Sequence, residues 1–158
     1  MITETTYYLT KEGLNRIKKE YVALCEFKKA KTRGEVPSAL HSEEINPEYL
    51  AFQEDLTLLE VRLNEHEVIL KNAKLIIPPG AKERKLVSLG AKVTILVDGK
   101  DVDEFEIVGT LEANPSLGKI SNESPVGKAL LGHMVGEKVS VSSPTETIFT
   151  IQKIRYRA

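Results

Sequence analysis

The sequence is poor in the residues that build covalent or metal-held folds. It has one cysteine, Cys25, three histidines and no tryptophan. A single cysteine excludes an intramolecular disulfide, and so few Cys and His residues form no cluster with zinc-ligand spacing. No apolar run approaches the roughly 20 residues that a membrane-spanning helix needs. The first residues lack the basic stretch and apolar core of a signal peptide. The sequence therefore predicts a cytoplasmic protein.

Strong net charge is also missing. The 158 residues carry a formal charge of −1, with 41% apolar and 28% charged residues, which is typical of one ordinary domain or two small soluble ones. The balance hides a local contrast. Residues 11–33 hold eight Lys or Arg against three Glu, whereas residues 35–67 hold nine Asp or Glu and only Arg62. Two explanations stay open: ion pairs between neighbouring helices, or a basic arm for RNA or DNA phosphates beside an acidic tip for a cationic destination.

The first half of the chain predicts two helices. Thr10 is a suitable N-cap, and apolar residues then recur with helical spacing until Gly34 and Pro37 interrupt the pattern. Asn46 and Pro47 begin the second helix, because Asn is a preferred N-cap and Pro fits the first helical position.

The second helix carries a narrow apolar seam with alternating spacings of three and four residues. Its members are Tyr49, Phe52, Leu56, Leu59, Leu63, His66, Leu70 and Ala73, of which only His66 is strongly polar. A seam of this kind is typical of a helix paired in a coiled coil. We therefore expect residues 1–77 to form an antiparallel coiled-coil hairpin with its tip at about residues 34–46. His66 is expected to pair with a glutamate of the first helix.

The second half, residues 78–158, predicts a small α+β domain with an antiparallel sheet. Residues 93–97 and 102–108 read as strands around a tight Asp98–Gly99 turn, and residues 139–141 and 148–154 as two more around a turn near residues 143–145. A short helix is expected between Pro125 and Leu131. The fold class is thus α+β.

Several segments in fixed order resemble those of the GreA/GreB family of bacterial transcript cleavage factors. They are residues 8–14 (YLTKEGL), 46–49 (NPEY), 120–132 (ISNESPVGKALLG), 136–139 (GEKV) and 143–144 (SP). The resemblance spans essentially the whole chain.

This resemblance implies a fold and a function. It implies an FKBP-like C-terminal domain that docks at the rim of the secondary channel of RNA polymerase, with Ser124 and Pro125 as a candidate docking surface. The hairpin would reach the polymerase active site, where two acidic side chains at the tip help to hold Mg²⁺. The polymerase then cleaves its own backtracked nascent RNA. Such a factor is not itself an enzyme, has no cofactor of its own, and is expected to be a monomer.

The tip departs from the family pattern. When Asn46 and Tyr49 are aligned with the family, Ser42 and Ile45 take the positions of its two acids, and Glu43 and Glu44 lie between them. A second alignment puts Glu43 on the second acidic position but needs a two-residue insertion. We predict Glu43 and Glu44 as a displaced catalytic and metal-binding pair, with Asn46 and Tyr49 supporting the tip.

The same residues allow other interpretations. Glu43 and Glu44 could be solvated loop residues, and the protein could then be a regulator that occupies the channel without stimulating cleavage. Ser124 and Pro125 could simply begin the short helix, with Ser as N-cap and Pro at its first position. A peptidyl-prolyl isomerase is disfavoured, because the second half has only Phe105, Phe149 and Tyr156 as aromatic residues for a proline pocket. A generic coiled-coil adaptor leaves residues 120–132 unexplained.

Overall fold

The computed structural model describes residues 5–142 and 145–157. The chain divides into two compact units, residues 14–72 and residues 1–13 together with 73–158. We call them the hairpin unit and the sheet unit. This division differs from the predicted boundary after residue 77, because β1 (Tyr7–Leu9) pairs in parallel with β4 (Ala73–Leu75).

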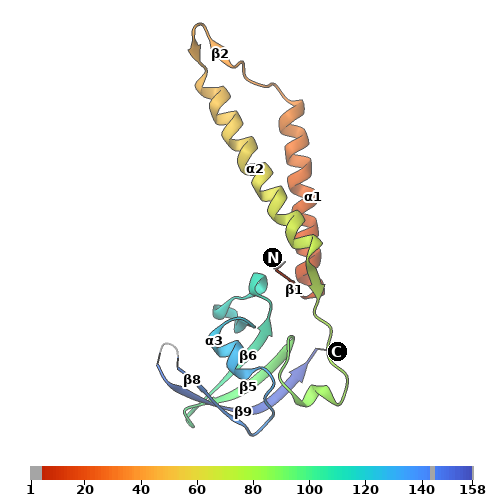
Figure 1. Ribbon diagram of the computed structural model, residues 1–158, viewed down its shortest axis with the longest axis vertical. Coiled ribbons are helices and arrows are strands. Elements are labelled where there is room, and N and C mark those ends of the chain that lie inside the picture. Colours follow the sequence, from red (N-terminus) through yellow and green to blue (C-terminus); the bar gives the residue numbers. More distant parts are fainter. Residues whose placement is uncertain (1–4, 143–144, 158) are drawn as a thin grey trace. The chain divides into compact units, whose positions relative to one another are not determined.

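The hairpin unit is built from two helices that run antiparallel, α1 (Lys11–Arg33) and α2 (Pro47–Lys71) (Figure 1). At about 1.5 Å per residue they are roughly 35 and 38 Å long. Polar pairs join them, among them Glu20 with His66, Lys28 with Glu60 and Lys31 with Asp55. The expected pairing of His66 with a first-helix glutamate is therefore confirmed, and ion pairing between the two oppositely charged arms occurs.

The predicted seam is the side of α2 that is removed from solvent. Leu59 and Leu63 are buried, and the other seam residues within the helix are half-buried. Ala73 is the exception, because α2 ends at Lys71 and Ala73 begins β4. The helix stops where Asn72 donates its backbone N–H to Val68 O at 3.1 Å.

A five-stranded sheet forms the centre of the sheet unit, in the order β7-β6-β5-β9-β8 (Figure 1). The strands are β5 (Ala91–Val97), β6 (Asp101–Val108), β7 (Lys119–Ser121), β8 (Lys138–Val141) and β9 (Thr147–Tyr156). Three of the four pairings are antiparallel, but β6 and β7 run parallel. The expected antiparallel sheet is thus a mixed one, because the short strand β7 returns through two 3-10 turns, Thr110–Glu112 and Pro115–Leu117.

The β5–β6 connection confirms the predicted turn. Asp98 and Gly99 both have positive φ, 51° and 71°, and Lys100 donates its N–H to Val97 O at 3.0 Å. Two central residues with positive φ define a type I′ turn, whose twist suits a β-hairpin. The other predicted turn involves residues 143–144, which lie outside the described residues. The same holds for residues 1–4, for which no signal peptide is expected.

The predicted short helix is confirmed as α3 (Pro125–Leu130). The core of the sheet unit is a set of apolar side chains to which α3 contributes Leu130. The buried members are Val87, Ala91, Val93, Ile95, Ile107, Leu130, Val139, Val141, Phe149 and Ile151.

Gln152 is an extra residue in β9 opposite the Thr94–Ile95 step of β5. Such a bulge shifts the alternation by one residue, so Phe149 and Ile151 face the core and Ile154 and Tyr156 follow on even positions. Another 3-10 turn, Glu83–Lys85, lies before β5 in the chain. None of the helices in the described ranges has the length and apolar composition that crossing a bilayer requires.

Candidate functional site

The tip of the hairpin unit is a miniature β-hairpin that the sequence did not predict. β2 (Leu40–His41) pairs antiparallel with β3 (Glu44–Ile45), with Leu40 opposite Ile45 and His41 opposite Glu44. Ser42 and Glu43 form the two-residue turn. Asn-Gly or Asp-Gly usually marks such turns, and residues 42–43 carry neither. The expected loop of residues 34–46 is therefore more ordered than its composition indicates.

Ser42 adopts an unusual backbone conformation. Its φ is +63°, and it is one of two non-glycine residues with positive φ in the described chain. Since Glu43 does not share this sign, only the first central residue of the turn is left-handed, as a type II′ turn requires. Glycine is the usual residue there because it has no Cβ. Ser42 is thus held by the hairpin in a conformation that its own side chain disfavours.

Glu43 and Glu44 are both exposed, at the turn and at the first residue of the returning strand. Successive side chains along a strand point to opposite faces, so Glu44 and Ile45 lie on different faces of β3. Ile45 and its partner Leu40 are 62% and 61% exposed. The tip therefore presents two solvated carboxylates together with an exposed apolar pair.

Asn46 fixes the tip to the start of α2. Its Oδ1 accepts a hydrogen bond from Glu48 N at 3.1 Å, which confirms it as the N-cap, and its Nδ2 donates to Ser38 O at 2.9 Å. Its backbone N–H donates to Ala39 O at 3.1 Å. Tyr49 is half-buried in the first turn and accepts a hydrogen bond from Gln53 Nε2 at 2.7 Å. Asn46 thus ties together both sides of the small hairpin.

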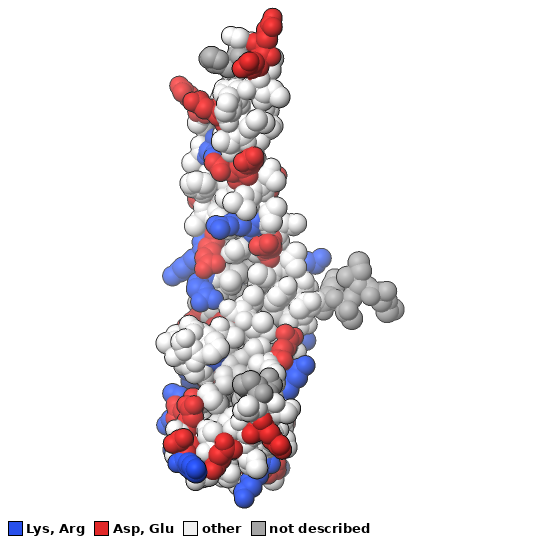
Figure 2. All heavy atoms as spheres, turned by 90° about the vertical axis from the view of Figure 1, so that its left-hand side faces the viewer, with Lys and Arg blue, Asp and Glu red and all other residues white. Residues whose placement is uncertain are grey.

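Acidic side chains dominate the outer part of the hairpin unit. Figure 2 shows Asp and Glu gathered at and below its upper end, with few Lys or Arg beside them. Carboxylate oxygens are the hard ligands that Mg²⁺ prefers. Among the residues that the structure describes, however, no group of three or more His, Cys, Asp or Glu is arranged to hold a metal ion. Glu43 and Glu44 alone do not make up such a group.

A tyrosine in the middle of the hairpin has a strongly altered acidity. Tyr21 donates its hydroxyl hydrogen to Glu67 Oε1 at 2.8 Å. This bond, assisted by the nearby Cys25, raises the pKa of Tyr21 to about 12, because ionisation would place a phenolate beside the carboxylate. The pair joins α1 to α2 and is far from the tip in sequence, so it belongs to the scaffold.

The sheet unit holds the other candidate residues, Ser124 and Pro125, at the start of α3. Ser124 Oγ accepts a hydrogen bond from Gly127 N at 3.0 Å and donates to Ser121 O at 2.7 Å. Pro125 occupies the first helical position and is exposed. The capping interpretation of Ser124 is therefore confirmed, and Pro125 is the member of the pair whose side chain is free to meet a partner.

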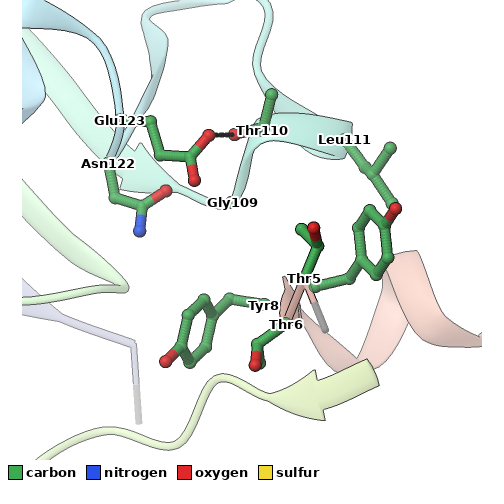
Figure 3. A pocket seen from close by; sticks show the side chains of 9 residues that line it. Thr5, Thr6, Tyr8, Gly109, Thr110, Leu111, Asn122 and Glu123 are labelled. Atoms are coloured by element: carbon green, nitrogen blue, oxygen red, sulfur yellow. Dashed lines mark hydrogen bonds between the residues drawn. The ribbon is translucent and has the colours of Figure 1, made fainter. Parts of the chain in front are cut away.

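A small cavity of about 160 Å³ lies between β1 and the segments around residues 109–111 and 122–123 (Figure 3). Gly109 is required there, because a Cβ at this position would come within 2.0 Å of Tyr8 O. Thr110 donates its hydroxyl hydrogen to Glu123 Oε2 at 2.9 Å, as drawn in Figure 3. Glu123, the one carboxylate among the described lining residues, is thus already engaged, and these residues include no nucleophile–base pair.

The start of α1 contains a contact that sequence analysis missed. Thr10 Oγ1 accepts from Gly13 N at 3.1 Å, as the predicted N-cap should, and donates to Glu112 Oε1 at 2.6 Å. Glu112 Oε2 also accepts from Thr10 N at 2.7 Å. A carboxylate is favourable at the positive end of a helix. Glu112 is 102 residues away in sequence, so no local pattern could have revealed it.

The chain is similar to several known proteins. Residues 82–156 match the family described as "Transcription elongation factor, GreA/GreB, C-term". Transcription elongation factor GreA of Thermomicrobium roseum is 39% identical over 142 residues, covering 89% of this chain and 90% of that protein. GreA of Acetivibrio thermocellus is 38% identical over 159 residues, covering 98% and 99%.

Among solved structures, GreA factor homolog 1 of Thermus thermophilus is 26% identical, covers 96% of this chain and 99% of that one, and has a TM-score of 0.41. Two of the sequence relatives exceed 35% identity to this chain over nearly their whole length. This chain belongs to the GreA/GreB family of transcription elongation factors.

Proposed function

We propose that this protein binds RNA polymerase at its secondary channel and stimulates cleavage of backtracked nascent RNA. In this proposal the seam between α1 and α2 is that of a coiled coil, and the hairpin tip enters the channel. The sheet unit, with an FKBP-like fold, docks at the channel rim through the surface around Pro125. The acidic tip formed by the β2–β3 hairpin is the observation that carries the proposal.

The residues of this chain would contribute binding and positioning. Glu43 and Glu44 would supply oxygen ligands to a Mg²⁺ ion shared with the polymerase, and Asn46 would hold the tip in shape through its bonds to Ser38 O and Glu48 N. A second metal ion in such a site stabilises the attacking and leaving oxygens of phosphodiester hydrolysis. Since these two carboxylates are only part of a ligand set, the polymerase remains the enzyme.

The experiment is transcript cleavage on stalled, backtracked elongation complexes with the wild type and the Glu43→Gln/Glu44→Gln double variant. We expect the wild type to shorten RNA from its 3′ end and the variant to do so roughly 10²-fold more slowly, because catalysis is sensitive to loss of a positioned charge. Binding to polymerase should change by no more than about threefold, since exposed charges contribute little to affinity.

The matched control is Glu35→Gln/Glu48→Gln, which removes the same charge from two exposed acids outside the β-hairpin. It should cleave at close to the wild-type rate. Equal cleavage by the Glu43/Glu44 variant and the wild type would contradict the assigned pair. A wild type that binds and inhibits without shortening RNA would instead identify the protein as a channel-occupying regulator.

A further inference from the structure

Among the exposed apolar side chains of the hairpin unit that lie outside the seam, four line neighbouring grooves. Phe27 of α1 is 60% exposed, and Leu50, Leu58 and Val61 of α2 are 46%, 57% and 49% exposed. We call these four residues the flank patch. Single exposed apolar residues are ordinary on protein surfaces, but a contiguous set points to a contact.

Two neighbouring grooves show that the flank patch is continuous. Phe27 and Leu58 line one groove together with Leu59 and Arg62. Leu58 also lines the next groove, with Leu50 and Val61. Leu58 therefore connects the aromatic side chain of α1 with the aliphatic side chains of α2.

The flank patch is separate from the seam that joins the helices. Leu50 precedes the buried Leu59 by nine residues, which at about 100° per residue places it half a turn away around the helix. Val61 is likewise about 200° from Leu59. α2 therefore has apolar residues on two opposite sides, of which α1 covers one. A helix that is apolar on both sides normally buries both.

The charges around the flank patch indicate what covers it. Glu54 lines the groove of Leu50 and Val61, and Glu65 lines a groove with Phe27. Neither forms an ion pair within the described residues, whereas Asp55 is already paired with Lys31 at 3.3 Å. Arg62 lines both grooves that contain Phe27 and, like the two glutamates, forms no ion pair within the described residues. The border therefore carries two unpaired carboxylates against one guanidinium. A second copy of this chain would bring two net acidic borders together, and like charges oppose such an association.

We propose that the flank patch is a second contact surface, distinct from the tip, that packs against an apolar protein surface bordered by Lys or Arg side chains. This inference rests on the proposed function, in which that surface belongs to RNA polymerase. The flank patch would then hold the hairpin along its side, whereas Glu43 and Glu44 act at its end. Its loss should weaken binding without altering the cleavage rate of the bound complex.

The experiment measures the Kd of the full chain for RNA polymerase elongation complexes by biolayer interferometry. Phe27→Ser is compared with Val22→Ser, its matched control on the same helix. Val22 is 58% exposed, against 60% for Phe27, but lies about 140° away around α1. We expect Phe27→Ser to weaken binding roughly tenfold, as for an aromatic residue at an interface, and Val22→Ser to stay within about twofold. Cleavage at saturating protein should be unchanged for both.

Two further variants keep the test independent of folding defects in Phe27→Ser. Leu58→Ser should weaken binding as Phe27→Ser does. Glu54→Lys leaves every apolar side chain in place, and it should weaken binding roughly threefold because it opposes a basic border. Far-UV circular dichroism verifies that each variant is folded.

The outcomes separate this inference from the proposed function. If Phe27→Ser and Leu58→Ser both bind polymerase with the affinity of the wild type, the flank contact is overturned and the proposed function stands. Failure of the wild type to bind polymerase overturns both. A wild-type dimer in sedimentation equilibrium that Phe27→Ser abolishes would assign the flank patch to a second copy and likewise overturn the inference.

Discussion

The hairpin unit and the sheet unit begin a helix with the same local device and use it for different purposes. Asn46 and Ser124 are both N-caps, and each is followed by a proline at the first helical position. Ser124 begins a helix that buries Gly127 and Leu130 in the sheet core. Asn46 begins a helix whose first turns are largely exposed, and its second bond, to Ser38 O, shapes the tip. A capping motif therefore identifies a helix start but not what the helix is for.

The two units also differ in how much they bury. The sheet unit has a contiguous core of ten buried apolar residues, whereas Ile17, Leu59 and Leu63 are the buried apolar residues among those described for the hairpin unit. Folding stability depends on apolar burial, so it should be concentrated in the sheet unit. The hairpin unit, with few buried contacts, leaves most of its surface available for binding.

The largest expected effect tests this difference in burial. Ile95 is fully buried at the centre of the sheet, and Ile95→Ala should lower the free energy of unfolding of the sheet unit by about 2–5 kcal/mol because it leaves a cavity. Leu63 is 8% exposed, and Leu63→Ala should lower the free energy of unfolding by less than Ile95→Ala does, since a thin two-helix layer can relax around the gap. Urea denaturation followed by circular dichroism and by Tyr fluorescence measures both changes.

Ile148→Ala is the control, because Ile148 lies in the same sheet but is 47% exposed. It should change the unfolding free energy by less than about 1 kcal/mol. Equal losses for Ile95→Ala and Leu63→Ala would show that the two units unfold together and would contradict the proposed concentration of stability in the sheet unit.

The paired N-caps give the next largest effect. Ser124→Ala should lower the stability of the sheet unit by about 1 kcal/mol, because Gly127 N loses its acceptor next to the core. Asn46→Ala should leave global unfolding nearly unchanged, since its bonds lie at an exposed tip, but increase hydrogen exchange of the amides of Asn46 and Glu48. A large global loss from Asn46→Ala, with none from Ser124→Ala, would reverse the comparison.

Regular patterns made much of this structure predictable from the sequence. The seam of α2, the Asp98–Gly99 turn and the Pro125 helix start each depend on residues close together in the chain, whose spacing or backbone preference is visible directly. The family resemblance, carried by residues 120–132, was likewise a local signal that the relatives confirmed.

Long-range pairings were not predictable in the same way. The contact of Glu112 with Thr10 and the parallel pairing of β1 with β4 join segments with no shared pattern. Strand β7 is three residues long and lacks alternation strong enough to identify it. The tip hairpin was missed because Ser42 occupies a position where glycine is the usual signal. The roles of Glu43 and Glu44 remain predictions, because function at the tip depends on the partner as well as on this chain.

The smallest expected effect concerns pH and the link between α1 and α2. The pKa of Tyr21 is raised to about 12 from 10.0 by its hydrogen bond to Glu67, so the neutral hydroxyl is the form that stabilises the folded hairpin. Its contribution is complete below pH 10 and is lost as the pH rises towards 12. Tyr21→Phe lacks the bond at every pH. The thermal midpoints of wild type and Tyr21→Phe should therefore differ slightly at neutral pH and converge between pH 10 and 12.

Glu67→Gln sharpens the same test, because the amide oxygen still accepts a hydrogen bond but carries no charge. In this variant the near-ultraviolet absorbance of tyrosinate should develop at lower pH than in the wild type, since no carboxylate opposes ionisation of Tyr21. The sheet unit provides the internal comparison: Tyr156 donates its hydroxyl hydrogen to Leu86 O, and Glu67→Gln should leave the stability of the sheet unit unchanged. If the alkaline titration of Glu67→Gln matched that of the wild type, the bond between Tyr21 and Glu67 would not be what holds the phenol neutral. The polar link between the two helices would then rest on the other pairs, Glu20–His66, Lys28–Glu60 and Lys31–Asp55.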